Sequence, residues 1–286
     1  MIAAILEPLR YEFFLRALLA SSLVGLICAV VGTYVVLKGI SFIGDGISHA
    51  AFPGIVAAFV LQGPYYIGAA VAAVSTALAI GFVSRRGFLR MDTAIGVLFA
   101  GTFALGVFMF SLIQGYVADL FSFLFGNVLA ISPTDLLALV ILGSLVLGAV
   151  ALLWKELLYA TFDPLGAQAS GIRVGLLDYV FLSIVALAIV VSLQAVGIIL
   201  VVAMLVTPAA TAQLLTSRFG SMMRIAVAIG VGSAIAGLYL SYWLDVASGA
   251  TIVLTETGVF FVALTLGPST GVLGLWRSRH AVPSEA

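Results

Sequence analysis

The sequence predicts an all-α integral membrane protein, and two observations predict it: the composition, and the length of the apolar runs. Of 286 residues, 63% are hydrophobic and only 8% are charged, with a mean hydropathy of +1.28. Soluble domains carry a charged exterior of roughly a quarter of the sequence. Because that exterior is missing, most of the surface must face lipid, where helices satisfy their own backbone hydrogen bonds.

Apolar runs of membrane length alternate with short polar breaks along the whole chain. A helix needs about 20 mostly apolar residues to cross a bilayer, which gives about nine spans here. Residues 1–286 are therefore expected to form a single transmembrane domain, with an amphipathic lead at 1–12 and a cytoplasmic tail at 270–286. The expected spans are 13–37, 47–62, 65–84, 93–114, 133–154, 178–193, 196–215, 222–243 and 250–267.

The sixth and seventh spans form one nearly unbroken apolar run, interrupted only by Gln194 and Gly197. Fusing them would place the later basic residues on the opposite side of the membrane. Two crossings joined by a tight hairpin at 194–197 are therefore preferred. A total of eight spans stays open if one short segment is re-entrant.

The basic residues fall on alternate loops. With nine spans and an external N-terminus, the external loops contain no Lys or Arg, and only Arg10 and Arg16 in the lead lie outside. This asymmetry follows the positive-inside rule and places the C-terminus inside. With 12 basic and 12 acidic residues, attraction to nucleic acid is not supported. The internal basic residues are Lys38, Arg85, Arg86, Arg90, Lys155, Arg173, Arg218, Arg224, Arg277 and Arg279.

An external loop at 115–132 is rich in aromatic residues and carries Asp119 without a base. This composition is typical of an interfacial aromatic belt. The loop would also serve as a docking surface for an external partner.

The stretch GDGISHAAFPG places Asp45 and His49 at the start of the second span. Residues four apart share one face of a helix, so the carboxylate and imidazole can reach the same ion. Ionisable groups inside spans are rare and mark substrate paths or relays. Imidazole with carboxylate suits manganese, iron or zinc, whereas copper(I) would want thiolates. The alternative is a buried pair in which the two groups satisfy each other.

Glu256 is a weaker candidate within the ninth span, where it lines the path, meets a helix end or pairs with a hydroxyl such as that of Thr255. Two ligands are too few for manganese, which prefers octahedral, oxygen-rich coordination. We therefore hypothesise that two copies of the second span face each other across a two-fold axis and pool their Asp45 and His49 side chains.

The chain offers no energy source of its own. A P-loop needs a Gly-rich run ending in Lys followed by Ser or Thr, and Lys38 and Lys155 have no such setting. No HExxH protease motif is present either. Two rivals remain: a secondary transporter in which Asp45, His49 and Glu256 carry protons, and an intramembrane hydrolase.

Several separated stretches resemble the permease of ABC-type manganese, zinc and iron importers, the ABC-3 family: VGTYVVLKGISFIGDGISHAAFPGIVAAF, LFGNVLAISPTDL, VSLQAVGIILVVAMLVTPAATAQLL and DVASGATIVL. The resemblance covers roughly residues 10–268 and implies a fold like the permeases of type II ABC importers. It implies a homodimer in the bacterial inner membrane, two separate ATP-binding subunits and an extracytoplasmic metal-binding protein. The chain itself would be no enzyme and hold no permanent cofactor.

The resemblance also assigns residues. It places Asp45 and His49 on the metal path, with manganese as the favoured cargo and zinc or iron as alternatives. Composition alone favours helix packing for 207–223, but the resemblance implies a cytoplasmic coupling segment that docks on the ATPase. Its expected coupling residues are Thr207, Pro208, Ala209, Ala210, Gln213 and Arg218.

Overall fold

The structure is a computed structural model that describes residues 7–113 and 128–266. Over these residues every regular element is a helix, which confirms the expected all-α class. The expected tail at 270–286, the start of the lead and most of the aromatic external loop lie outside the described residues. The elements are η1 (Pro8–Arg10), α2 (Glu12–Leu37), α3 (Ile43–Ala50), α4 (Phe52–Val60), α5 (Tyr65–Arg85), α6 (Met91–Ser111), η2 (Val128–Ala130), α8 (Pro133–Leu152), α9 (Trp154–Phe162), α10 (Pro164–Ala169), α11 (Val174–Val196), α12 (Ile198–Leu215), α13 (Phe219–Leu244) and α14 (Ser248–Leu266).

Within the described residues, nine helical segments are long and apolar enough to cross a membrane. They correspond one by one to the expected spans, so the prediction of about nine membrane-length helices is confirmed. The second segment, Ile43–Val60, consists of α3 followed by α4. The short helices α9 and α10 connect the fifth segment to the sixth.

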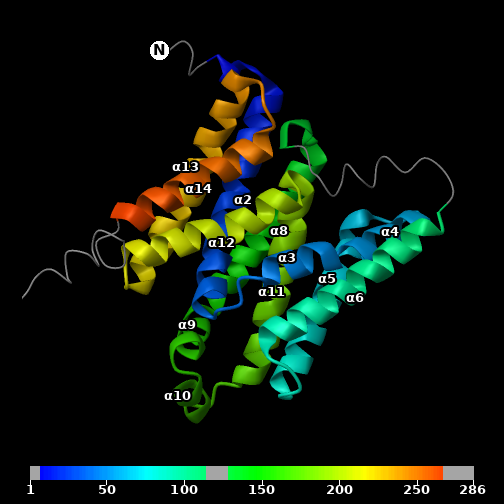
Figure 1. The fold of residues 1–286 in the computed structure, drawn as a ribbon, viewed down its shortest axis with the longest axis vertical. Helices are drawn as coiled ribbons and strands as arrows, with labels where there is room; N and C mark the ends of the chain where they lie inside the picture. The colour runs from blue at the N-terminus through cyan, green and yellow to red at the C-terminus, as the bar shows by residue number, and fades with distance from the viewer. Residues whose placement is uncertain (1–6, 114–127, 267–286) are drawn as a thin grey trace, which may run out of the picture.

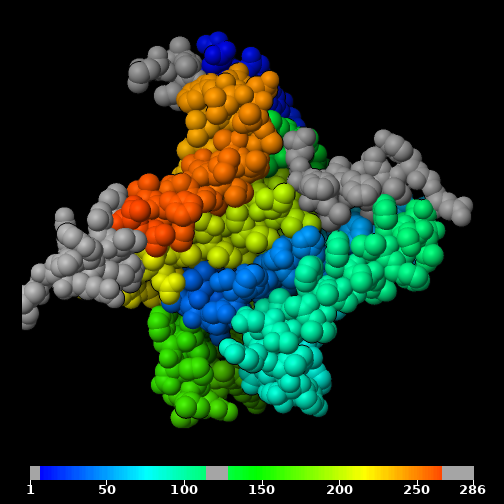
Figure 2. Space-filling model, in the orientation of Figure 1, coloured from blue at the N-terminus to red at the C-terminus, as the bar shows by residue number. Residues whose placement is uncertain are grey.

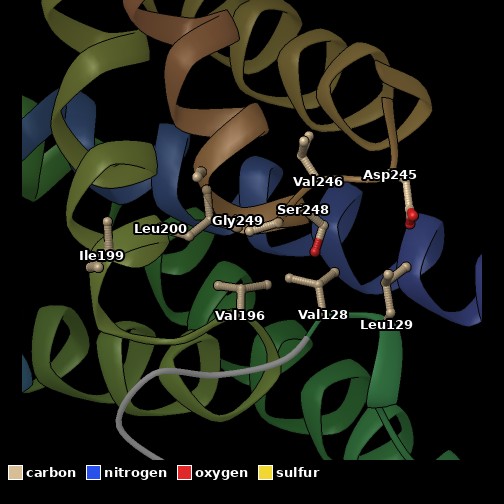
Figure 3. A pocket seen from close by; sticks show the side chains of 11 residues that line it. Val128, Leu129, Val196, Ile199, Leu200, Asp245, Val246, Ser248 and Gly249 are labelled. Carbon is tan, nitrogen blue, oxygen red and sulfur yellow. The ribbon is translucent and has the colours of Figure 1, made fainter. Parts of the chain in front are cut away.

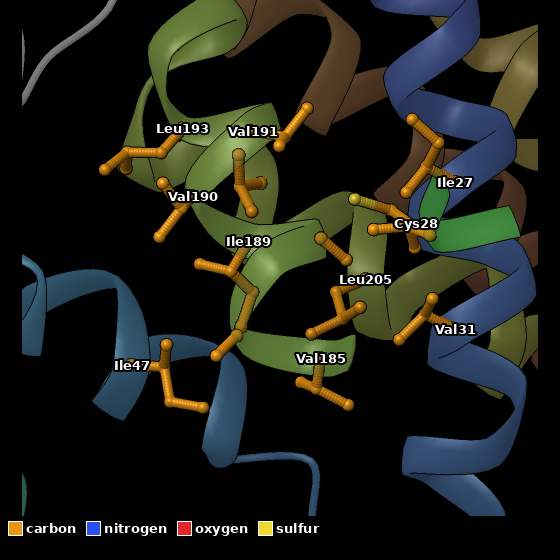
Figure 4. Close-up of a cluster of buried hydrophobic side chains, with 14 of the residues drawn as sticks. Ile27, Cys28, Val31, Ile47, Val185, Ile189, Val190, Val191, Leu193 and Leu205 are labelled. Atoms are coloured by element: carbon orange, nitrogen blue, oxygen red, sulfur yellow. The ribbon is translucent and has the colours of Figure 1, made fainter. Parts of the chain in front are cut away.

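Helix α2 forms the centre of the bundle. It packs against α8, α11, α12 and α13, while α5 and α6 form a wing on one side together with α3 and α4 (Figure 1). Helices α9 and α10 project from one end of the bundle in Figure 1. The core is built mainly from aliphatic side chains of α2, α11 and α12 (Figure 4).

Close helix crossings are made where glycine removes a side chain. A Cβ atom on Gly32 of α2 would lie 1.8 Å from the carbonyl oxygen of Leu205 in α12. Without a hydrophobic driving force between helices in lipid, such close backbone approach supplies the packing energy. The contact fixes how α2 crosses α12.

The second span bends where α3 meets α4. Pro53 lies in the first turn of α4 and has no backbone N–H to donate to the carbonyl group of His49 four residues earlier. Ala51 separates the two helices. The break between α3 and α4 therefore lies just after His49.

The chain turns at Gly197 between α11 and α12. Gly197 has φ 81° and ψ 168°, a backbone region that is essentially open to glycine alone. Helix α11 ends one residue before it and α12 starts one residue after it. The prediction of two separate crossings at 194–197 is confirmed.

The segment 207–223 covers the end of α12 and the start of α13. Helix α12 does not end at Pro208 but continues to Leu215, and α13 starts at Phe219. Pro208 and Ala209 are buried, and small side chains pack against the neighbouring helices there. One such cluster consists of Ala29, Ala209, Ala212, Met222 and Ala226.

Charged residues meet at the end of the bundle from which α9 and α10 project. Asp178 of α11 accepts a hydrogen bond from Lys38 Nζ at 3.1 Å and from Arg85 Nη1 at 2.6 Å. These three residues join the ends of α2 and α5 to the start of α11. Basic residues from separate loops therefore gather at one end, as the predicted topology requires.

Candidate metal site

Helix α3 presents two different faces. Ile43 and Ile47 are fully buried, and Ile47 lies near α11 in the apolar cluster of Figure 4. Asp45 and His49 follow two residues after each isoleucine, which rotates them to the opposite side of the helix. The apolar face anchors α3 in the bundle, and the polar face with Asp45 and His49 is not needed for that packing.

Asp45 and His49 do not bury each other. Asp45 Oδ1 lies 3.5 Å from His49 Nε2, and the side chains are 47% and 28% exposed. A pair kept only for mutual satisfaction would be close and enclosed. In the protomer both groups remain partly exposed, so a further ligand can reach them.

Helix α3 reaches the surface of the molecule, where Asp45 and His49 are partly exposed. Figure 2 shows the surface of α3, in mid blue at the centre, between α12 and the wing of α5 and α6. A charged carboxylate facing bare lipid would be costly. The polar face of α3 must therefore meet a polar cavity, an ion or another protein surface.

Glycines bring neighbouring helices close to α3. A Cβ atom on Gly44 would lie 2.9 Å from Leu205 Cδ2, and one on Gly46 would lie 2.8 Å from Ile95 Cγ2. Both glycines are thus used to seat α3 between α12 and α6.

The imidazole of His49 is held by aromatic rings of α6. Its centroid lies 5.4 Å from that of Phe99 and 5.1 Å from that of Phe103, the latter with planes at 76°. His49 Nδ1 is buried and has no hydrogen-bond partner among the described residues. Only the Nε2 side, toward Asp45, is free to act on a ligand.

Sequence reasoning missed Phe99 and Phe103. The available signal was their i, i+4 spacing, which puts both rings on one face of a helix. That spacing could not reveal that the face meets His49, because α3 and α6 are joined only by tertiary packing.

Glu256 does not join the pair. Across the described residues, no group of three or more His, Cys, Asp and Glu side chains is placed to hold a metal ion. Glu256 is 0% exposed, and both of its carboxyl oxygens lack a partner among those residues. The expected pairing with Thr255 is also absent, since that hydroxyl donates to the carbonyl of Thr251.

The expected coupling residues divide into two groups. Pro208 and Ala209 are packed inside the bundle, and Thr207 and Ala210 are half-buried. Gln213 and Arg218 are exposed near the junction of α12 and α13. Only the exposed pair is accessible to a partner without rearrangement.

A separate cavity of about 460 Å³ lies among η2, the α11–α12 turn and the α13–α14 link. Its wall is mainly aliphatic, and Asp245 and Ser248 supply side-chain oxygens (Figure 3). Asp45 and His49 are not part of it. The cavity is therefore distinct from the carboxylate–imidazole pair.

Three comparisons bear on the function. The family described as "ABC 3 transport family" matches residues 10–267. The manganese transport system membrane protein MntC of Halalkalibacterium halodurans is 47% identical over 96% of this chain and 94% of its own. A probable iron transport system membrane protein of Haemophilus influenzae is 40% identical, over 91% and 96%.

Among solved structures, PsaBC from Streptococcus pneumoniae in complex with Fab superposes with a TM-score of 0.85. Its sequence is 35% identical, and the match covers 96% of this chain and 100% of that one. The similarity thus extends over the whole fold.

Proposed function

The chain belongs to the ABC 3 transport family. It is a multi-pass permease of a metal-transporting ABC importer in the bacterial inner membrane. From this premise we propose that it is the permease of an ATP-driven importer whose cargo is Mn²⁺. The MntC relative is named for manganese. Another relative is named for iron. The choice of Mn²⁺ as cargo therefore also rests on the ligand chemistry of this chain.

The observation that carries the proposal is the open carboxylate–imidazole pair on α3. Asp45 and His49 together offer an oxygen and a nitrogen donor at the same place. Mn²⁺ accepts both but prefers more oxygen ligands than one chain supplies here. The cation, rather than a resident cofactor, is the substrate that these side chains bind and release.

A second copy of the chain would supply the missing ligands. The side chains of Asp45 and His49 on α3 are partly exposed at the surface of the protomer. Two such surfaces, related by a two-fold axis, would bring together two carboxylates and two imidazoles. The same contact would remove the charged groups from lipid, which supports the homodimer on energetic grounds.

Two ATP-binding subunits are proposed at the end where Lys38, Arg85 and Asp178 meet. By the positive-inside rule this end is cytoplasmic, with the N-terminus outside and the C-terminus inside. Helices α9 and α10 project there (Figure 1) and carry exposed Phe162 and Leu165. Apolar side chains exposed beyond the membrane favour a protein partner. The predicted contacts of Gln213 and Arg218 belong to the same proposal.

An extracytoplasmic metal-binding protein is proposed at the opposite end. The cavity beside Asp245 faces that end under the same topology, and its carboxylate is compatible with a site where a cation or a partner's basic group arrives.

The test is cation uptake into vesicles that contain the permease, the ATPase and the metal-loaded binding protein. We expect ATP-dependent Mn²⁺ uptake that exceeds uptake of Zn²⁺ and Fe²⁺. Asp45→Ala and His49→Ala should each lower it at least about tenfold, since each removes a metal ligand. Glu12→Gln, which alters an exposed ion pair at the start of α2, is the control.

Full uptake by both alanine variants would contradict the assigned site. Uptake that persists without the ATPase and stops when the proton gradient is dissipated would instead support the secondary transporter.

A further inference from the structure

The two nitrogens of His49 lie in opposite environments. Nε2 faces the carboxylate of Asp45 at 3.5 Å, on the open side of α3. Nδ1 is buried without a hydrogen-bond partner among the described residues, on an imidazole packed against Phe99 and Phe103. The imidazole ring is therefore polar on its Nε2 edge. On its Nδ1 edge it is enclosed by an apolar wall, which consists of the rings of Phe99 and Phe103.

The wall is held firmly in place. Phe99 and Phe103 stack on each other at 6.1 Å, and Phe103 also contacts Phe52 of α4 at 5.9 Å. On the α3 side, Gly46 allows Ile95 to approach so closely that an added Cβ atom would overlap with it. Helices α3, α4 and α6 thus lock the imidazole from several sides, and the wall has little freedom to admit a polar group.

This arrangement differs from that of an ordinary histidine ligand. A histidine that binds a metal through one nitrogen almost always donates the N–H of its other nitrogen to a carboxylate, a carbonyl or water, which orients the ring and strengthens the ligand. Here no acceptor for Nδ1 lies among the residues that the structure describes.

The missing acceptor affects where the imidazole proton resides. Without a cation, a proton on Nε2 points toward the Asp45 carboxylate, which favours that tautomer. When a cation takes the Nε2 lone pair, the same proton must reside on Nδ1, where the N–H faces only aromatic rings. A buried N–H without an acceptor is unfavourable, so cation binding is opposed by the wall.

We propose, on the premise that Asp45 and His49 carry the transported cation, that Phe99 and Phe103 are positioning residues that keep His49 a weak ligand. They fix the direction of Nε2 and at the same time deny Nδ1 an acceptor. The cation is consequently held long enough to be oriented but not long enough to be retained. Weak binding is what a transit site requires, because a tightly held cargo would block the next transport cycle.

The first test restores an acceptor. Phe99→Gln and Phe103→Gln each introduce an amide oxygen into the wall, and Phe99→Leu and Phe103→Leu serve as apolar references. Mn²⁺ dissociation constants are measured for the full-length permease in nanodiscs by competition with a fluorescent chelator. We expect at least one Gln variant to bind Mn²⁺ about 10- to 100-fold more tightly than its Leu counterpart, with slower uptake in the reconstituted complex.

Phe108→Gln is the matched control, because Phe108 lies on the same helix with its side chain largely exposed. Its affinity should stay at the wild-type value. If both wall Gln variants bind Mn²⁺ no more tightly than the Leu variants, the proposal is overturned.

The second test observes the imidazole directly. The chain contains 2 histidines, so His280→Ala leaves His49 as the single ¹⁵N-histidine signal. In metal-free protein we expect the proton on Nε2. On addition of Zn²⁺, a diamagnetic probe, the proton should move to Nδ1 and give the shift of an N–H without a strong acceptor. A strongly hydrogen-bonded Nδ1–H in either state would overturn the proposal.

The metal-free spectrum distinguishes failure of the proposed transport function from failure of the inference about Nδ1. If the wild-type permease binds neither Mn²⁺ nor Zn²⁺ and the alanine variants of Asp45 and His49 transport normally, the proposed function is wrong. The spectrum would still show whether Nδ1 lies in an apolar wall.

Discussion

At the scale of single residues, the cost of isolating a charge governs the placement of polar groups. Lys38 and Arg85 share one carboxylate, Asp178, and all three side chains are partly shielded from water. Two cations held close together without that carboxylate would repel each other. Asp178 is therefore the residue on which the contact among α2, α5 and α11 depends.

We expect Asp178→Ala to lower the free energy of unfolding by about 1–3 kcal/mol, as for lost hydrogen bonds to charged groups. Thermal unfolding of the purified permease in detergent measures the effect. The control is Glu12→Gln, which removes the exposed pair with Arg16 one helical turn away and should change stability by about 0.5 kcal/mol or less. Equal unfolding temperatures for Asp178→Ala and wild type would show that the shared carboxylate does not stabilise the fold.

The candidate site could be predicted only in part at this scale. Asp45 and His49 were identifiable because an ionisable pair in an apolar run is unusual and its spacing fixes its face. Phe99 and Phe103 were not, because aromatic residues in a span are ordinary lipid-facing or packing residues until their neighbours are known. The environment of Glu256 likewise depends on packing that no local pattern records.

At the scale of helices, backbone chemistry explains where the predictions held and where they did not. Gly197 adopts a positive φ angle, and the proline at position 53 breaks the second span. Both breaks follow from the residue type at a single position, so they can be predicted from the sequence. Pro208, by contrast, lies inside α12, which continues past it to Leu215. In a membrane, neighbouring helices can compensate for a missing backbone donor, and that compensation is invisible in the sequence.

The crossing of α2 and α12 makes an element-scale prediction. Gly32→Ala places a Cβ atom 1.8 Å from a backbone oxygen, which no rotamer change can relieve. We expect a loss of stability of about 1–3 kcal/mol or more from overpacking and reduced yield of folded permease. Gly232→Ala is the matched control, since a Cβ atom there meets nothing within 4 Å. Unfolding curves of the two variants that coincide would contradict the close crossing.

At the scale of the whole molecule, number and order of spans were predictable because bilayer thickness fixes helix length and composition reveals lipid exposure. What could not be predicted is which exposed faces meet lipid and which meet protein, since both are apolar. Helix α6 has few buried residues, and α3 carries its charged pair outward. The open polar face therefore distinguishes a protein-covered surface from a lipid-covered one.

The homodimer can be tested at Phe42, which precedes α3 and is 73% exposed. Its helical position puts it on the same side of α3 as Asp45 and His49. If two copies face each other through that side, Phe42→Cys in a Cys28→Ser background should cross-link to itself with a short bis-maleimide in native membranes. Leu152→Cys is the control, because Leu152 at the end of α8 is 84% exposed but belongs to a different helix. Efficient dimer formation through position 152 and none through 42, in membranes that transport Mn²⁺, would exclude a shared cation site between the two second spans.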